Sequence, residues 1–336
     1  MDEKKTLQKI HKYIVFSPYF GRLPVGFNLW LESCSYNKNF SFVVFTDNDV
    51  DEEIPDNVEI VRMSFDEFRE KIQKKFKFKV SLNEPYKLCD FKPTYGYVFS
   101  DYIKGYDYWG YCDLDLIFGD IEKFMPDEKY DKISYHGHFC LYKNLANIRE
   151  MFMENSNNTI GYIDILSHGQ SFAFDEIGDY GINKIFQDRG LSIYDFRKFV
   201  ADVNCRRKRM YCRGRVLSEN GKGRRFFGKN DKEKIFVFDN GKVYSYNVKG
   251  KKFDDEYAYV HFQKRKMVNK VRNRDRFLIT YDSFVDYPFD ETEFRKYSPK
   301  NWIDFRWIKV RMHTIPRRLN RDFAVMRLKQ KKGRSM

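Results

Sequence analysis

The hydrophobic and polar positions of the first 120 residues follow two alternating patterns. Runs rich in aromatic and β-branched residues are typical of buried strands, and they occupy residues 11–17, 40–47, 58–61 and 106–112. Between these runs, residues 24–36 and 65–72 carry apolar side chains three and four positions apart, as helices do. Ser64 followed by Glu67 predicts a capping box at the start of the second helix. The alternation predicts an α/β fold with a mixed, mainly parallel sheet flanked by helices.

The rest of the chain shows weaker patterns. Residues 84–97 predict a loop that leads into a helix ending near Lys104, and residues 147–155 and 180–189 predict helices. Strands are expected at 133–142, 171–176, 191–195, 257–265 and 277–284, and a hairpin at 235–246 around Asn240-Gly241. A helix is expected from Trp302 to Met312, with Pro316 as its interruption. We therefore divide the chain into a domain at residues 1–265 and a basic, helical extension at 266–336.

Polar residues follow the predicted strands of the first half. In a parallel α/β sheet the carboxyl ends of the strands meet at one edge, where ligands bind. Gly21, Asp47 and the pair Asp113 and Asp115 all fall at such ends. If the chain stays extended, Asp113 and Asp115 face one side while Leu114 points into the protein.

Two carboxylates held together in a protein repel each other unless a cation lies between them. Solvated loop charges are the alternative for an Asp-x-Asp triplet, but the aromatic and apolar segment before Asp113 favours a partly buried pair. Oxygen ligands suit a hard divalent cation, so we expect Mg²⁺ or Mn²⁺ at Asp113 and Asp115.

Other polar residues allow two interpretations each. Lys87, Asp90 and Lys92 are either a solvated face or contacts to phosphate and to a sugar or base. Asp175 and Glu176 are either catalytic carboxylates or favourable charges at a helix start. His136 and His138 share a face of their predicted strand, and a paired polar edge is favoured over a metal site because the pattern shows no carboxylate nearby. His261 is either structural or part of a diphosphate site with Lys264 and Arg265.

The formal charge of +14 over 336 residues is concentrated at one end. Residues 301–336 contain eleven Lys or Arg and two Asp or Glu, and so carry +9 of it. This favours a basic tail over a nucleic-acid groove. Apolar residues among the positive charges fit an anionic membrane surface, and a solvated tail is the alternative.

Cellular location is suggested by what the sequence lacks. No apolar run approaches the ~20 residues of a membrane span, and the N-terminus shows no signal-peptide core. The six cysteines form no Cys-x-x-Cys pair and are expected to be reduced. We expect a cytoplasmic protein that can lie peripherally at the inner face of the membrane.

The order of these motifs along the chain resembles that of a known enzyme family. The segments 18–21, 45–47, 86–93, 111–120 and 261–265 together resemble bacterial polysaccharide glycosyltransferases, of the capsule or lipopolysaccharide type, that have the GT-A fold and an Asp-x-Asp motif. The resemblance covers roughly residues 10–265. It implies a GT-A-like, Rossmann-like domain that binds a nucleotide-sugar donor across the strand ends, with a UDP-sugar as the default, and transfers a hexose to a cell-surface glycan or lipid-linked acceptor.

The resemblance also implies roles for individual residues. Asp113 and Asp115 would hold Mn²⁺ or Mg²⁺ on the donor diphosphate, and His261 would complete the coordination. Asp175 or Glu176 would activate the acceptor in an inverting enzyme or position it in a retaining one. The remaining donor contacts would be Pro18, Tyr19, Phe20, Asp47, Lys87, Asp90, Lys92, Lys264 and Arg265.

Two other function classes stay open. The pI of about 9.2 and the 18% aromatic content suggest a nucleic-acid-binding protein, but the aromatic residues fall inside predicted strands and the charge falls in the tail, so no nucleic-acid partner is expected. A metal-dependent phosphoryl-transfer enzyme could use the same acidic pair, but the sequence lacks the Gly-x-x-x-x-Gly-Lys-Ser/Thr loop.

Overall fold

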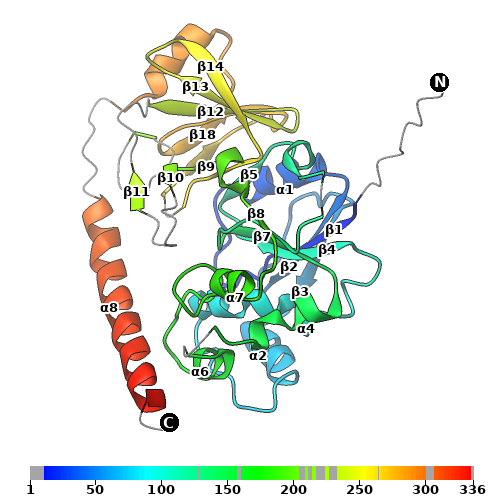
Figure 1. Cartoon of the computed structure of the whole chain (residues 1–336). Helices are drawn as coiled ribbons and strands as arrows, with labels where there is room; N and C mark the ends of the chain where they lie inside the picture. The colour runs from blue at the N-terminus through cyan, green and yellow to red at the C-terminus, as the bar shows by residue number, and fades with distance from the viewer. Residues whose placement is uncertain are drawn as a thin grey trace, which may run out of the picture.

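The structure, a computed structural model, is a mixed α/β protein (Figure 1). It describes residues 11–127, 129–156, 160–203, 209–210, 214–216, 224–226, 233–263, 265–299 and 306–333.

A seven-stranded sheet forms the centre of the larger part of the molecule. Its strand order is β3 (Val58–Arg62), β2 (Phe40–Thr46), β1 (Tyr13–Phe16), β4 (Tyr108–Cys112), β7 (Phe139–Lys143), β6 (Lys132–Ile133) and β8 (Ile193–Tyr194). The first four strands are parallel neighbours, while β7 runs antiparallel to β4. The predicted strands of the first half are thus confirmed, and their carboxyl ends lie at one edge.

Helices cover one face of this sheet, and a helix with a small sheet covers the other. The first face packs against α2 (Phe65–Gln73), α6 (Tyr162–Leu166), α7 (Ile182–Asp188) and the turns η1 (Pro85–Lys87), α3 (Leu88–Phe91), η2 (Lys92–Thr94) and α4 (Tyr95–Val98). The capping box of Ser64 and Glu67 is confirmed at the start of α2. The opposite face packs against α1 (Phe27–Ser35) and the strands β5 (Leu116–Phe118) and β15 (Tyr259–His261).

Two more sheets complete the upper part of Figure 1. The three-stranded sheet has the order β5-β15-β9, with β9 at Val200–Asp202. The six-stranded sheet has the order β14 (Lys252–Tyr257), β13 (Lys242–Asn247), β12 (Lys234–Asp239), β17 (Arg276–Ile279), β18 (Ser283–Asp286) and β16 (Val268–Lys270). It takes strands from both sides of residue 265, which corrects the domain boundary that we predicted there. Asn240 and Gly241, with φ of 45° and 79°, form the predicted hairpin turn between β12 and β13.

Short elements connect these parts. They are η3 (Glu122–Phe124), α5 (Ala146–Arg149), η4 (Met151–Met153), η5 (Phe196–Phe199), β10 (Gly214–Val216), β11 (Arg224–Phe226) and η6 (Glu291–Tyr297). Cys34, Cys89, Cys112 and Cys140, the cysteines among the described residues, form no disulfide.

Several predicted elements are wrong in detail. The strand expected at 133–142 is two antiparallel strands, β6 and β7, because Ser134 turns the chain at a φ of 80°. The strand expected at 277–284 is likewise the hairpin of β17 and β18. Pro316 does not interrupt the last helix, α8 (Arg306–Gly333), which continues through it. A proline removes one backbone hydrogen bond from a helix, and α8 packs on the body beyond it through Ala324, Val325 and Leu328. Among the residues that the structure describes, no helix is both long enough and apolar enough to cross a bilayer.

Candidate metal and donor site

Asp113 and Asp115 lie where β4 leaves the central sheet. Just after β4 ends, Asp113 N donates one more backbone hydrogen bond, to His138 O at 2.9 Å. The chain then bends at Leu114 and Asp115 and continues as β5 in the three-stranded sheet. Leu114 is buried, as predicted, and the side chains of Asp113 and Asp115 are 38% and 31% exposed. A bend thus replaces the extended segment that we expected, but both carboxylates still reach the surface.

The pairing of β5 with β15 brings His261 to the two aspartates. Leu116 is opposite His261 in this antiparallel pair, so the residue before Leu116 meets the imidazole. Asp115 Oδ1 lies 3.5 Å from His261 Nε2. One ligand atom from each of Asp113, Asp115 and His261 lies within 4.8 Å of the other two. These are the three residues that the sequence analysis assigned to a metal.

Asp202 is a member of the site that the sequence analysis missed. It ends β9, which pairs in parallel with β15 and places Asp202 beside His261. Its Oδ1 lies 3.0 Å from His261 Nδ1 and also accepts a hydrogen bond from the amide of Gln263. Burial alone would lower the pKa of His261, but the charges and hydrogen bonds of Asp115 and Asp202 raise it to about 10.

The two histidines of the predicted polar edge also belong to this region. The His136 and His138 rings stack with centroids 4.3 Å apart, and the His138 ring lies 3.9 Å from that of His261. His138 Nδ1 is 3.2 Å from the hydroxyl of Tyr259. Asp202, His138 and His261 form a second group with metal-ligand spacing, so a carboxylate does lie near these histidines. Local sequence could not show it, because strand pairing brings it there.

Lys92 connects the acidic pair to Asp175. Its Nζ donates to Asp113 Oδ1 at 2.6 Å and to the Gly137 carbonyl at 2.7 Å, and lies 3.5 Å from Asp175 Oδ2. Burial alone would lower the pKa of Lys92, but Asp113 and then Asp175 raise it. The lysine is therefore a charged group that orients carboxylates, rather than the solvated face that was one of its two interpretations.

Asp175 lies in a turn, not at the end of the strand expected at 171–176. The backbone N–H groups of Phe172 and Phe174 donate to the Asp90 carboxylate (2.9 Å each) instead of to a neighbouring strand, and Ala173 has a φ of 55°. Burial raises the pKa of Asp175 well above its ordinary value. Its neighbour Glu176 is half-buried. Asp175 thus reaches the site from a loop that a buried charge holds in shape.

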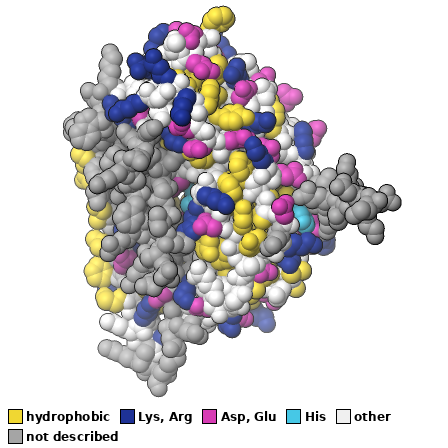
Figure 2. All heavy atoms as spheres, turned by 45° about the horizontal axis from the view of Figure 1, so that its top comes forward, with side chains coloured by type: hydrophobic (Ala, Val, Ile, Leu, Met, Phe, Trp, Pro, Cys, Tyr) yellow, Lys and Arg dark blue, Asp and Glu magenta, His cyan; other side chains and the backbone are white. Residues whose placement is uncertain are grey.

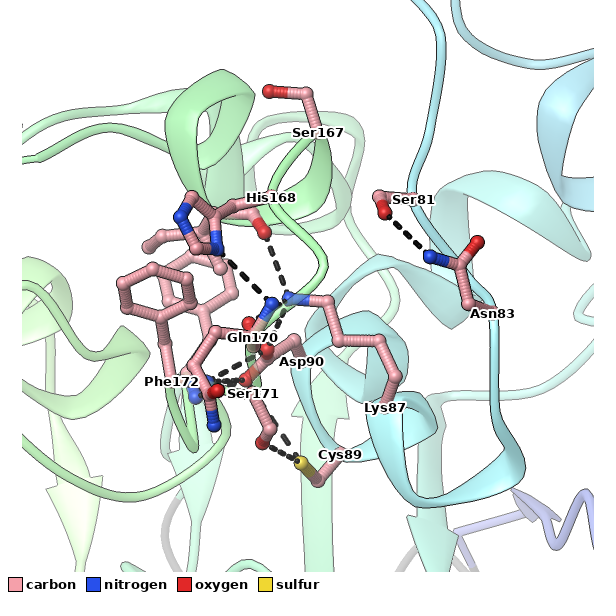
Figure 3. A network of polar contacts seen from close by, with 12 residues as sticks. Ser81, Asn83, Lys87, Cys89, Asp90, Ser167, His168, Gln170, Ser171 and Phe172 are labelled. Atoms are coloured by element: carbon pink, nitrogen blue, oxygen red, sulfur yellow. Dashed lines mark hydrogen bonds and ion pairs between the residues drawn. The ribbon is translucent and has the colours of Figure 1, made fainter. Parts of the chain in front are cut away.

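The buried charge that holds this loop is the Asp90 carboxylate, which forms an ion pair with Lys87 (Figure 3). The two side chains are 1% and 0% exposed and lie 2.6 Å apart. Lys87 Nζ also donates to the carbonyls of Ile165 and Gln170, at 2.8 and 2.7 Å. The solvated face is therefore wrong for Lys87 and Asp90, which fix the 165–174 loop from within, and their contact with a donor stays a prediction.

The loop after β1 lies beside the aspartates. Ser17 Oγ lies 2.9 Å from Cys112 Sγ. The next residues in the chain are Pro18 and Asp113, so the loop after β1 and the segment after β4 begin next to each other. Burial, and then the charges of Asp115 and Asp113, raise the pKa of Tyr19. Pro18 and Tyr19 are half-buried here, whereas Phe20 packs in the core against Phe65 and Phe68, which corrects its predicted contact with the donor.

Asp47, at the end of β2, is exposed and fixes this loop. Its Oδ1 accepts a hydrogen bond from Gly21 N at 2.9 Å. On the other side of the site, Arg265 donates to the carbonyls of Tyr281 (2.7 Å) and Arg209 (3.3 Å), so its guanidinium is held at the six-stranded sheet. Lys264 lies outside the described residues.

Comparison with known proteins gives a family. The profile of a family of unknown function, DUF6625, matches residues 15–288, and the chain belongs to that family. The matched region includes the site residues described above. No curated protein matches the chain.

Proposed function

We propose that this member of the family is a metal-dependent glycosyltransferase, which moves a hexose from a nucleotide-sugar donor, a UDP-sugar by default, to a glycan or lipid-linked acceptor in the cytoplasm. The observation that carries the proposal is the convergence of Asp113, Asp115 and His261 at the end of β4. Four parallel strands with their loops at the same edge support the finer comparison with a GT-A fold.

The donor set fits a divalent cation. Two partly exposed carboxylates and one imidazole suit Mn²⁺, and Mg²⁺ is the alternative for a site richer in oxygen. Asp113 uses Oδ1 for Lys92, so we assign Oδ2 to the metal. Asp202 holds Nδ1 of His261 and directs Nε2 toward Asp115, which is the usual way a carboxylate orients a histidine ligand. When bound, the cation would neutralise charge on the diphosphate oxygens.

The chain's own residues would then bind and orient the two substrates. Tyr19, half-buried beside the aspartates, would contact the nucleoside, and Asp47 holds the loop that contains Tyr19. In the transfer, the bond from the anomeric carbon to the diphosphate oxygen breaks with its electron pair going to that oxygen, and the acceptor hydroxyl oxygen forms the new bond.

The acceptor's proton needs a base in an inverting reaction. Asp175 is our candidate because Lys92 ties it to Asp113, which brings its carboxylate to the proposed metal site. Glu176, next to it, is the second candidate. In a retaining reaction the same two residues would position the acceptor.

Ligand binding and product identity test the proposal together. We expect Mn²⁺ with a UDP-sugar to raise the melting temperature, and a chelator to abolish the rise. Asp115→Ala should remove the response, while Asp254→Ala, at an exposed position on β14, should keep it. Transfer releases a nucleoside diphosphate, so phosphate release without it would favour the phosphoryl-transfer class. No response to any sugar nucleotide, with tight and salt-sensitive nucleic-acid binding, would contradict the proposal.

A further inference from the structure

Helix α8 exposes one continuous hydrophobic stripe. Among the α8 side chains that the structure describes, the large hydrophobic ones with the greatest exposure are Ile308, Met312, Ile315, Leu319, Phe323 and Met326. At about 100° of rotation per residue, these six positions fall within about 80° of one another. In Figure 2, hydrophobic side chains line the left edge of the molecule, the side on which α8 lies in Figure 1.

The opposite face of α8 is packed on the body. Ala324 is buried in the main core, with Val325 and Leu328 packed against the same cluster. Arg317 lies over the ring of Tyr86 at 4.5 Å, and Lys332 pairs with Asp164 at 2.9 Å. The stripe is therefore not the face that anchors the helix.

Basic residues flank the stripe on both sides. The sequence of α8 contains ten Lys or Arg and one acidic residue, Asp322. On the helical wheel, Arg318 lies on one side of the stripe and Arg327 and Lys331 on the other, while Lys329, on the side of Arg318, pairs with Asp179 of the body. An apolar stripe between basic residues, on a helix of low mean hydropathy, is the pattern of a helix that lies in a membrane interface.

We infer that α8 docks this stripe on an anionic lipid bilayer, with its apolar side chains among the acyl chains and its basic residues at the headgroups. Charge complementarity favours this partner, because an anionic leaflet attracts basic residues that lie near its surface. A second copy of the chain fits less well. In a coiled-coil dimer the helix would bury positions three and four residues apart, as Met312, Ile315 and Leu319 are. The next position in this spacing is Asp322, which is charged.

Co-sedimentation with vesicles tests the inference on the full-length protein. Vesicles of phosphatidylcholine with phosphatidylglycerol should bind the protein, and vesicles of phosphatidylcholine alone should bind it at least several-fold less. Leu319→Gln with Phe323→Gln should lower binding to the anionic vesicles by at least about tenfold. Phe289→Gln is the matched control, since Phe289 is 108% exposed but lies outside α8, and it should bind as wild type.

A charge variant separates the two parts of the surface. Arg318→Gln with Arg327→Gln should weaken binding to anionic vesicles and remove most of its salt dependence. All these side chains are exposed, so the melting temperature should not change. Equal vesicle binding by wild type and Leu319→Gln/Phe323→Gln would overturn the inference. The inference would also be overturned if the wild-type protein bound no vesicles and instead formed a dimer, seen by sedimentation velocity, that Leu319→Gln/Phe323→Gln dissociates. Vesicle binding needs no donor, so its outcome is independent of the glycosyltransferase proposal.

Discussion

Asp202 Oδ1 lies 3.0 Å from Nδ1 of His261, across the pair formed by β9 and β15. This contact leaves Nε2 facing Asp115 and so sets which ring nitrogen can bind a cation. Asp202 therefore controls the metal site without being one of the three ligands that we assign.

Replacing Asp202 tests this control. Asp202→Ala should weaken Mn²⁺ binding by about ten- to a hundredfold, since outer carboxylates orient a histidine ligand and raise its basicity. Asp202→Asn, which can keep the hydrogen bond but not the charge, should have a smaller effect. Calorimetric titration of Mn²⁺ measures both. Wild-type affinity in the alanine variant would mean that Asp202 does not control the metal site.

The pH dependence of metal binding tests His261 itself. Its pKa of about 10, which Asp115 and Asp202 raise against the opposing effect of burial, means that the imidazole is protonated at neutral pH. A metal must displace that proton, so the apparent Mn²⁺ affinity should rise by about tenfold per pH unit between pH 6 and 8. His261→Ala should bind weakly with little pH dependence over this range, because its remaining ligands are carboxylates. The same slope in both proteins would exclude His261.

Removing one partner of the buried ion pair of Lys87 and Asp90 should strongly destabilise the fold. Lys87→Met leaves the Asp90 charge buried without its partner, which should cost about 3–5 kcal/mol of unfolding free energy. The matched control is Lys104→Met, since Lys104 forms a pair of the same sequence spacing with Asp101 but both side chains are about 80% exposed (79% and 81%). There we expect less than about 1 kcal/mol. Urea denaturation measures both, and equal losses would contradict the assignment of Lys87 to the fold.

Gly137 makes room for Asp175. A Cβ at Gly137 would come within 2.5 Å of Asp175 Oδ2, which Lys92 holds, so Gly137→Ala must displace one of these groups. We expect a loss of about 1–3 kcal/mol in stability and a lower turnover of the donor. Gly169→Ala, whose nearest atoms would be at 3.6 and 3.7 Å, is the control and should behave as wild type. Unchanged turnover in Gly137→Ala would remove Asp175 from the reaction.

The first half of the fold could be predicted from sequence because its signals are local. Strands β1 to β4 are short aromatic or β-branched runs, and Ser64 with Glu67 caps α2 as expected. Asp113 and Asp115 stand directly after a strand, so the sheet edge follows from their positions. Leu114 is buried between them, as predicted, although a bend replaces the extended segment that the prediction assumed.

The missed features depend on contacts between distant segments. Asp202 meets His261 because β9 and β15 pair, and neither short strand has a strong pattern. The segment at 171–176 has the composition of a strand, yet its N–H groups bond to the carboxylate of Asp90, more than 80 residues away in sequence. Lys87 and Asp90 look like surface charges in sequence, because only the packed 165–174 loop makes their site buried.

The most direct test of the metal site is anomalous diffraction at the manganese edge from crystals grown with Mn²⁺ and UDP. We predict one strong peak at coordinating distance from Asp113, Asp115 and His261 Nε2, with the UDP diphosphate bound to the same ion. A peak elsewhere, or UDP bound with no ion between Asp113 and Asp115, would contradict it.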